Sequence, residues 1–212
     1  MTGVQTCALP IYRDYVIKDG KFVGKFEEMY QNCDDPWNQD EGDFVFKSLS
    51  LDLLERLGYQ DFQKILDIGC GKGRFTSEIQ NRFPQAEVFG IDISESAIRK
   101  AEVKYPHIFF QQFDVRKASF QYQNFDCIFI TEVIWYILPE IERVFREIHE
   151  GLKQSEGIFV LNNHFYQDDE QKYGREKITT LQTLLEIFPF HVEYTLENNR
   201  LDSHDVTIIA SA

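Results

Sequence analysis

Residues 65–75 read ILDIGCGKGRF, and this stretch decides the expected fold. A short apolar run ends in an acid, Asp67, and three glycines then follow on alternate positions, Gly69, Gly71 and Gly73. Glycine allows the sharp turns and the close ligand approach that a binding loop requires. Because ligands of open α/β sheets bind at the carboxyl ends of the strands, we expect this loop to bind a cofactor.

The spacing of the glycines argues against two phosphate-binding motifs. A nicotinamide site has the pattern GxGxxG, and its last position, counted from Gly69, is Arg74 in this chain. A Walker loop has the pattern GxxxxGK followed by Ser or Thr, and it begins at neither Gly69 nor Gly71. The pattern that remains is an acid followed by three alternating glycines, DIGCGKG.

Strand and helix patterns alternate around this loop. The predicted strands cover 64–68, 88–91, 108–113, 125–130 and 158–161, and the predicted helices cover 74–83, 94–105 and 139–152. Such alternation gives a parallel sheet with helices on both faces. A helix over 181–188 precedes two strands, 191–196 and 206–210, whose short polar connection requires antiparallel pairing. We therefore predict an α/β fold, a doubly wound Rossmann-like seven-stranded sheet, mostly parallel with an antiparallel C-terminal strand.

The motif DIGCGKG resembles the first motif of the class I S-adenosylmethionine-dependent methyltransferases, and the resemblance extends over roughly residues 60 to 165. In that family an acid at the end of the second strand takes both ribose hydroxyls, and Asp92 lies 19 residues after Gly73. A carboxylate suits this role because it accepts two O–H bonds at once. The resemblance implies that Ile93 packs on the adenine, that Asp114 lies near its amino group, and that the Val115 N–H meets a ring nitrogen.

The resemblance thus implies S-adenosyl-L-methionine as the cofactor. The cofactor-binding residues that we predict are Asp67, Gly69, Cys70, Gly71, Gly73, Asp92, Ile93, Asp114, Val115 and Thr131. Asp67 has a second interpretation, since in the family it mostly orients the loop and the amino group of the ligand.

Three residues at strand ends are candidates for the catalytic side of the site. His164 follows the fifth predicted strand, and histidine is the residue type most often used as a general base. Glu132 and Tyr136 follow the fourth strand, where the family faces the acceptor. A loop histidine and packing aromatic residues are the competing interpretations.

A narrower resemblance concerns the segments FEEMYQNCDDPW, TEVIWYILPE and the tail that ends in NNRLDSHD. They are similar to the nodulation protein S group, which N-methylates deacetylated chitin-type oligosaccharides. The favoured acceptor is therefore an amino-sugar or glycan nitrogen, with Tyr30 and Trp37 binding the substrate. The alternatives are O-methyl transfer to a sugar or carboxylate, and a non-catalytic cofactor-binding protein. Arg74 and the antiparallel terminal pair disfavour a nicotinamide oxidoreductase.

The chain divides into three parts at this stage. Residues 44–212 form the predicted methyltransferase domain, and residues 12–43, with a helix expected over 22–31, form an N-terminal lid segment. Residues 1–11, MTGVQTCALPI, match the translation of a sequencing-library adapter, and we expect them to be an assembly artefact outside the fold.

Composition limits the partners that we expect. The chain has 212 residues and a net charge of −13, which disfavours nucleic acid as a partner. Its four cysteines have no metal-ligand spacing, so we predict no metal site and a reducing, cytoplasmic location. No apolar run approaches the roughly 18 residues of a membrane span. A small-molecule or oligosaccharide acceptor is the expected partner, and the oligomeric state stays open.

Overall fold

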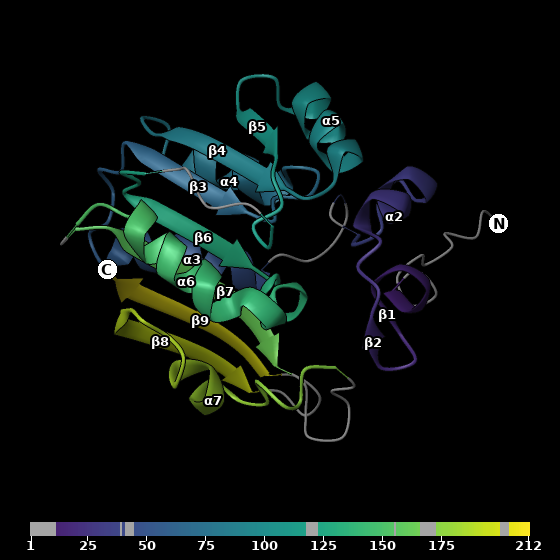
Figure 1. Ribbon diagram of the computed structural model, residues 1–212. Helices are drawn as coiled ribbons and strands as arrows, with labels where there is room; N and C mark the ends of the chain where they lie inside the picture. The colour runs from purple at the N-terminus through teal and green to yellow at the C-terminus, as the bar shows by residue number, and fades with distance from the viewer. Residues whose placement is uncertain are drawn as a thin grey trace.

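The computed structural model describes residues 12–38, 40, 45–117, 123–154, 156–165, 173–199 and 204–212. Seven strands form one sheet in the order β5-β4-β3-β6-β7-β9-β8 (Figure 1). They are β3 (Lys64–Ile68), β4 (Glu87–Asp92), β5 (Phe109–Gln112), β6 (Cys127–Thr131), β7 (Ile158–Phe165), β8 (His191–Asn199) and β9 (His204–Ser211). Strand β9 is antiparallel to both neighbours, and the other neighbouring pairs are parallel. The predicted fold class is confirmed, and the predicted artefact over 1–11 lies outside the described residues.

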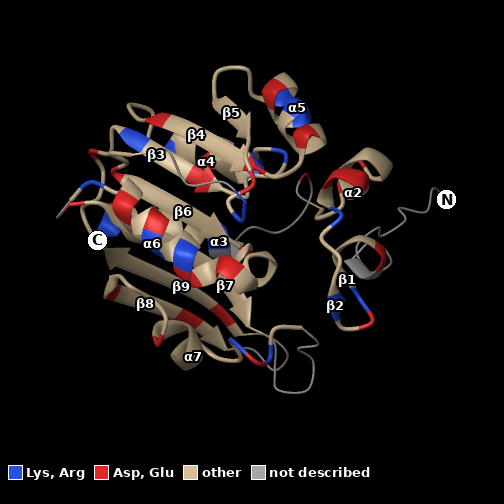
Figure 2. Cartoon of the chain, in the orientation of Figure 1, with Lys and Arg blue, Asp and Glu red and all other residues tan. Residues whose placement is uncertain are grey.

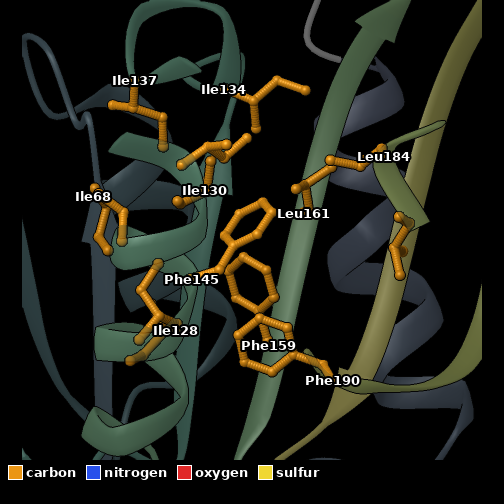
Figure 3. Packing of buried hydrophobic residues seen from close by; sticks show 14 of the residues in the cluster. Ile68, Ile128, Ile130, Ile134, Ile137, Phe145, Phe159, Leu161, Leu184 and Phe190 are labelled. Atoms are coloured by element: carbon orange, nitrogen blue, oxygen red, sulfur yellow. The ribbon is translucent and has the colours of Figure 1, made fainter. Parts of the chain in front are cut away.

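Helices pack on both faces of this sheet because the strands alternate in side-chain direction. On β3, Leu66 and Ile68 pack into a core with α6 (Ile141–Gly151) and α7 (Leu181–Leu185). On the other face, Ile65 packs with α3 (Val45–Arg56) and α4 (Arg74–Arg82). Helix α5 (Glu95–Lys104) lies beside β4 and β5. Figure 3 shows the α6 face, where Phe145, Phe159 and Phe190 fill the space between helix and strands.

The N-terminal segment lies beyond the carboxyl ends of the parallel strands (Figure 1). It contains a short π-helical turn (Tyr12–Val16), the two-residue strands β1 (Ile17–Lys18) and β2 (Lys21–Phe22), and α2 (Phe26–Asn32). The predicted helix over 22–31 begins later than expected, because Phe22 ends a hairpin. Asp19 and Gly20 both have positive φ, 51° and 72°, which closes a two-residue hairpin turn.

Strand β7 is longer than its apolar run predicts, and this changes the setting of His164. The strand continues through Asn162 and Asn163 to Phe165, since β9 pairs with it along its whole length. His164 therefore lies within the strand and not in a loop after it, and the predicted strand end at residue 161 is wrong.

Other predicted element ends also differ from the structure. Strands β8 and β9 extend into the polar stretch between them, for which the sequence predicted only a turn. Helix α7 ends at Leu185, earlier than the predicted 188. Across the described part of the chain, no helix is both long and apolar enough to cross a membrane.

Candidate active site

The glycine loop follows β3, and its conformation requires glycine. Gly69, Gly71 and Gly73 have φ values of 80°, 54° and 79°, which side chains rarely adopt. The Gly69 and Cys70 N–H groups donate to the Ile91 carbonyl oxygen at 2.8 and 3.0 Å, which fixes the loop against β4. A Cβ on Gly69 would lie 2.2 Å from Val133 Cγ2. The loop is thus a tight cradle at the carboxyl edge of the sheet.

Asp92 faces this cradle from the end of β4. Its two carboxylate oxygens accept the Gly71 N–H at 3.0 Å and the Ser94 N–H at 2.9 Å. Because a carboxylate offers about four lone-pair sites, these bonds leave acceptor capacity for hydroxyl groups. Burial raises the pKa of Asp92 to about 6, against the opposing effect of the two N–H donors. Asp92 is therefore mainly ionised at neutral pH and suited to accept O–H donors.

Asp67 and Cys70 have mainly structural surroundings. Asp67 is buried, accepts the Thr76 hydroxyl at 2.6 Å, and has its pKa raised by burial to about 6. The Cys70 side chain is buried in the cluster under α5, and burial raises its pKa well above the ordinary value. These contacts agree with the orienting role that was one of the two interpretations of Asp67.

Asp114 is held by an arginine that the sequence motifs did not single out. The Arg116 Nε and Nη2 atoms each lie 3.0 Å from one Asp114 oxygen, a bidentate pair. Burial raises the pKa of Asp114, but the bonds from Arg116 outweigh it and hold the pKa below its usual value. Arg143 donates to the carbonyl oxygens of Val115 and Arg116, each at 2.8 Å. The turn that carries the predicted adenine contacts is therefore rigidly braced.

Aromatic residues of the N-terminal segment meet the predicted acceptor side. The ring of Tyr136 lies 5.1 Å from that of Phe26 and 6.1 Å from that of Trp37. Tyr30 is buried, bonds to Trp37 through its side chain, and has its pKa raised by burial and by the Asp92 charge. Ile93 packs into the same cluster. The structure thus brings together Tyr30, Trp37, Ile93 and Tyr136, which come from three separate stretches of sequence.

A second group of predicted residues lies where β6 and β7 end. Glu132 has a φ of 58°, an unusual value for a residue with a side chain and one often seen at functional sites. Its N–H donates to the Asn162 carbonyl oxygen at 2.9 Å, and its carboxylate accepts the His164 N–H at 3.3 Å. Burial raises the pKa of Glu132, against the opposing charge of Lys47 on α3. Thr131 is buried and accepts from Asn162 Nδ2 at 3.3 Å.

The His164 ring faces a carboxylate that no sequence motif indicated. Its Nδ1 atom lies 2.9 Å from Asp205 Oδ1. Lys47 interacts electrostatically with both Glu132, beside His164, and Asp67 on the cofactor side, because its charge lowers the pKa of each. Burial in turn lowers the pKa of Lys47 itself. Asp205 lies in the stretch predicted as a turn and Lys47 in an ordinary helix, so no local pattern could have found either one.

The fold and the glycine cradle define a class of structure, a Rossmann-like sheet with a ligand loop after its first long parallel strand. Comparison with known proteins places the chain within that class. Residues 65–155 match the model of a family described as "Methyltransferase domain". The chain is 35% identical over 125 residues to the trans-aconitate 2-methyltransferase of Azoarcus sp., covering 59% of this chain and 49% of that protein. It is 32% identical over 113 residues to the malonyl-[acyl-carrier protein] O-methyltransferase of Legionella pneumophila, covering 50% and 38%. The chain spans half or less of these relatives.

Solved structures share the fold over a larger part of the chain. The N-methyltransferase NodS of Bradyrhizobium japonicum, in complex with S-adenosyl-L-homocysteine, superposes with a TM-score of 0.67 at 19% identity, covering 92% of this chain and all of that one. A TehB-like methyltransferase of Corynebacterium glutamicum gives a TM-score of 0.65 at 18% identity, covering 88% and 97%. At these identities the likeness shows the fold alone. Together with the domain match over residues 65–155, these similarities agree with the predicted Rossmann-like fold class.

Proposed function

We propose that the chain transfers a methyl group from S-adenosyl-L-methionine to a small-molecule acceptor, with an amino-sugar or glycan nitrogen as the favoured acceptor. The observation that carries the cofactor assignment is Asp92, a buried carboxylate fixed by the Gly71 N–H at the edge of a three-glycine cradle. The methyltransferase-domain match over 65–155 spans the same residues.

The residues at the edge of the sheet fit such a cofactor. A Cβ on Gly69 would meet the Val133 side chain and one on Gly73 the Phe110 side chain, so only glycine allows these side chains to pack so close to the loop. Asp92 would hold the ribose hydroxyls, and Ile93 with Tyr30 would provide an apolar wall beside them. When bound, S-adenosylmethionine supplies a methyl group already activated as a sulfonium. The chain therefore has mainly to orient the acceptor, which can contribute roughly 7–11 kcal/mol to the rate.

The charges on the acceptor side favour a cationic amine. Glu132 and Asp205 lie around His164, and Asp67 lies nearby on the cofactor side. Carboxylates attract an ammonium group, and a base is needed because a protonated amine has no lone pair. His164 is suited to remove that proton, and Trp37 with Tyr136 offers an aromatic surface for a sugar ring. NodS, which shares the fold, is an N-methyltransferase by name.

A carboxylate is the second candidate acceptor, and two observations favour it. The curated relatives are named for trans-aconitate and for a malonyl-carrier O-methyl transfer. Lys47, whose charge reaches Glu132 and Asp67, could pair with an anionic acceptor. A carboxylate needs no base at neutral pH, because it is already ionised. The two candidates therefore differ in their need for His164.

Two experiments test the proposal. Calorimetry with S-adenosylhomocysteine should show binding to the wild type and a severe loss in Asp92→Ala. No binding to the wild type would end the methyltransferase proposal, and binding without turnover of any acceptor would favour a non-catalytic binding protein. A screen of cofactor turnover with amino sugars, chitosan oligomers and small di- and tricarboxylic acids then selects the acceptor. Under the amine proposal His164→Ala loses about 10²- to 10⁴-fold in turnover, whereas with a carboxylate acceptor it should lose little.

A further inference from the structure

Asp205 lies directly opposite His164 in the sheet. The register pairs His164 on β7 with Asp205 on β9, and Asp205 with Asn198 on β8. His164 Nδ1 lies 2.9 Å from Asp205 Oδ1, and Asn198 Nδ2 donates to Asp205 Oδ2 over 3.4 Å. Three neighbouring strands thus place the three side chains in one row. The sheet, and not a loop, sets the orientation of the imidazole.

The chemistry of the pair selects one tautomer. An ionised carboxylate only accepts hydrogen bonds, so the ring nitrogen facing it carries the hydrogen. In the neutral ring the lone pair then lies on Nε2. A carboxylate in this position also stabilises the imidazolium that forms when the ring takes up a second proton.

The pair lies on the face of the sheet that packs against α3 and α4. Along β7, Ile158 and Val160 pack toward α3 and α4, and His164 is in phase with them. Asn162, also in phase, donates to Ser50 of α3 at 3.2 Å. The charged groups around the pair are Glu132, which accepts the His164 N–H, and Lys47, whose charge reaches Glu132.

We propose that Asp205 is a positioning residue that holds His164 with its hydrogen on Nδ1, so that Nε2 takes the proton from the acceptor. The role rests on the proposed function. The step is a proton transfer: an N–H bond of the acceptor ammonium breaks, its electron pair stays on nitrogen, and the proton bonds to Nε2. The imidazolium later releases that proton to water, which completes the balance.

The same hairpin offers a matched control. His204 Nε2 lies 2.8 Å from Glu197 Oε2, so a second histidine–carboxylate pair joins β9 to β8. His204 is one residue from Asp205 and therefore points to the opposite face of the sheet. Glu197→Gln removes a comparable contact from the hairpin without touching the proposed site.

Ring-nitrogen NMR tests the tautomer without any acceptor. In ¹⁵N-histidine-labelled protein with S-adenosylhomocysteine added, the His164 signals are assigned by their loss in His164→Gln. We expect the neutral ring to carry its hydrogen on Nδ1 in the wild type and in Glu197→Gln. In Asp205→Asn we expect a mixture of tautomers or the Nε2–H form. An Nε2–H ring in the wild type would overturn the proposal whether or not Asp205→Asn folds.

Kinetics with the acceptor from the turnover screen provide the second readout. Asp205→Asn should lower kcat about 10- to 100-fold, a part of the roughly 10²- to 10⁴-fold that a general base contributes. Its affinity for S-adenosylhomocysteine should stay within about twofold of the wild type, because Asp205 does not reach the glycine cradle; Glu197→Gln should change neither quantity. Loss of ligand binding by the wild type contradicts the proposed function. Wild-type turnover together with an unchanged kcat in Asp205→Asn contradicts the role of Asp205 alone.

Discussion

Asp92 is buried, yet its proposed role requires the ionised carboxylate. We therefore expect cofactor binding to depend on pH. The pKa is raised by burial to about 6, and accepting two hydroxyl donors requires the ionised form. We expect the affinity for S-adenosylhomocysteine to fall about tenfold between about pH 7.5 and pH 5, as the carboxylate takes up a proton. Calorimetry at both pH values measures this. An affinity that is equal at the two would contradict the prediction.

Asp67 titrates in the same range, so it provides the necessary control. Its pKa is also raised by burial to about 6, yet its carboxylate is bonded to Thr76. If Asp92 causes the pH dependence, Asp67→Asn should keep it, whereas Asp92→Asn should bind weakly at both pH values. If the pH dependence of the affinity is lost only in Asp67→Asn, Asp67 and not Asp92 is the group that causes it.

The free energy of unfolding should also depend on protonation of Asp67 and Asp92, but in the opposite direction to ligand affinity. Each folded pKa of about 6 exceeds the ordinary value of 3.8, so the folded state binds protons more tightly than the unfolded state. Their contribution is fully present below 3.8 and is lost as pH rises through about 6. Ligand binding and intrinsic stability therefore favour opposite ends of this pH range, as is common where a site is built from buried charge.

Gly69 allows backbone strain and steric clash to be separated. Gly58 has a φ of 89° and open space around the missing Cβ, whereas Gly69 has a φ of 80° and Val133 Cγ2 at 2.2 Å from it. Alanine should cost about 1 kcal/mol at Gly58 through the backbone alone. At Gly69 the clash should add about 1–3 kcal/mol. Chemical denaturation of both variants measures the difference, and equal losses would contradict the crowding of the cradle.

At the residue scale, the sequence predicted those residues whose spacing along the chain belongs to a known motif. The three glycines and Asp92 have fixed spacings, and the structure places them at one edge of the sheet. Asp205 contacts His164 because the fold brings β9 beside β7, and Arg116 contacts Asp114 across a local turn. No motif spacing indicated either residue. Polar residues gain their roles from such neighbours.

At the element scale, one glutamate joins α2 to the start of α5. Glu27 accepts the Ser94 hydroxyl at 2.7 Å, the Ser96 N–H at 3.0 Å and the Ser96 hydroxyl at 2.6 Å. Burial raises the pKa of Glu27, but these bonds outweigh it and lower the pKa to about 2. The carboxylate thus binds the amino end of α5, where a negative charge is favourable.

We expect Glu27→Gln to loosen this junction, with a loss of about 1–2 kcal/mol in the free energy of unfolding, allowing for partial exposure. Glu28→Gln is the control, because Glu28 lies on the same helix in an exposed pair with Lys25 at 3.0 Å. The folded pKa of Glu27 is depressed, so its contribution is present above the ordinary value of 4.5 and is lost as pH falls toward about 2. Denaturation near neutral pH and near pH 3 checks both statements; equal effects of the two variants would contradict them.

The lengths of the strands show where element prediction stops. The central strands β3 and β6 are buried on both faces, so their apolar runs predicted them within a residue or two. The last four residues of β7 include Asn162 and His164, whose side chains bond to Ser50 of α3 and Asp205 of β9. They also include Asn163, whose side-chain amide donates to the neighbouring His164 carbonyl oxygen. A hydropathy pattern cannot identify a strand whose polar residues are satisfied by long-range contacts.

At the scale of the whole molecule, charge joins the N-terminal segment to the sheet domain. Figure 2 shows acidic residues on α2 and mixed charge on α5, which faces it. Lys72 is nearly buried and lies 3.2 Å from Asp35 and 2.5 Å from Asp40. Lys100 lies 3.0 Å from Asp34, and Lys104 also pairs with Asp40. The alternating pattern of 64–161 predicted the sheet, but these pairings join residues 30 or more positions apart and left no signal in the sequence.

Because the Lys100–Asp34 and Lys104–Asp40 pairs are partly exposed, the contact should weaken with salt. Raising the ionic strength from about 0.05 to 0.5 M shortens the Debye length to a few ångströms, which screens exposed pairs more than buried ones. Hydrogen exchange should therefore quicken for the amides of 26–38 and stay unchanged in β3 and β6. Adding S-adenosylhomocysteine at high salt should slow exchange in 26–38 again, since Tyr30 lies beside Asp92 in the proposed site. Exchange in 26–38 that responds to neither salt nor ligand would contradict attachment of this segment through exposed ion pairs. The bonds of Glu27 to Ser94 and Ser96 and the aromatic contacts with Tyr136 would then be its main attachments.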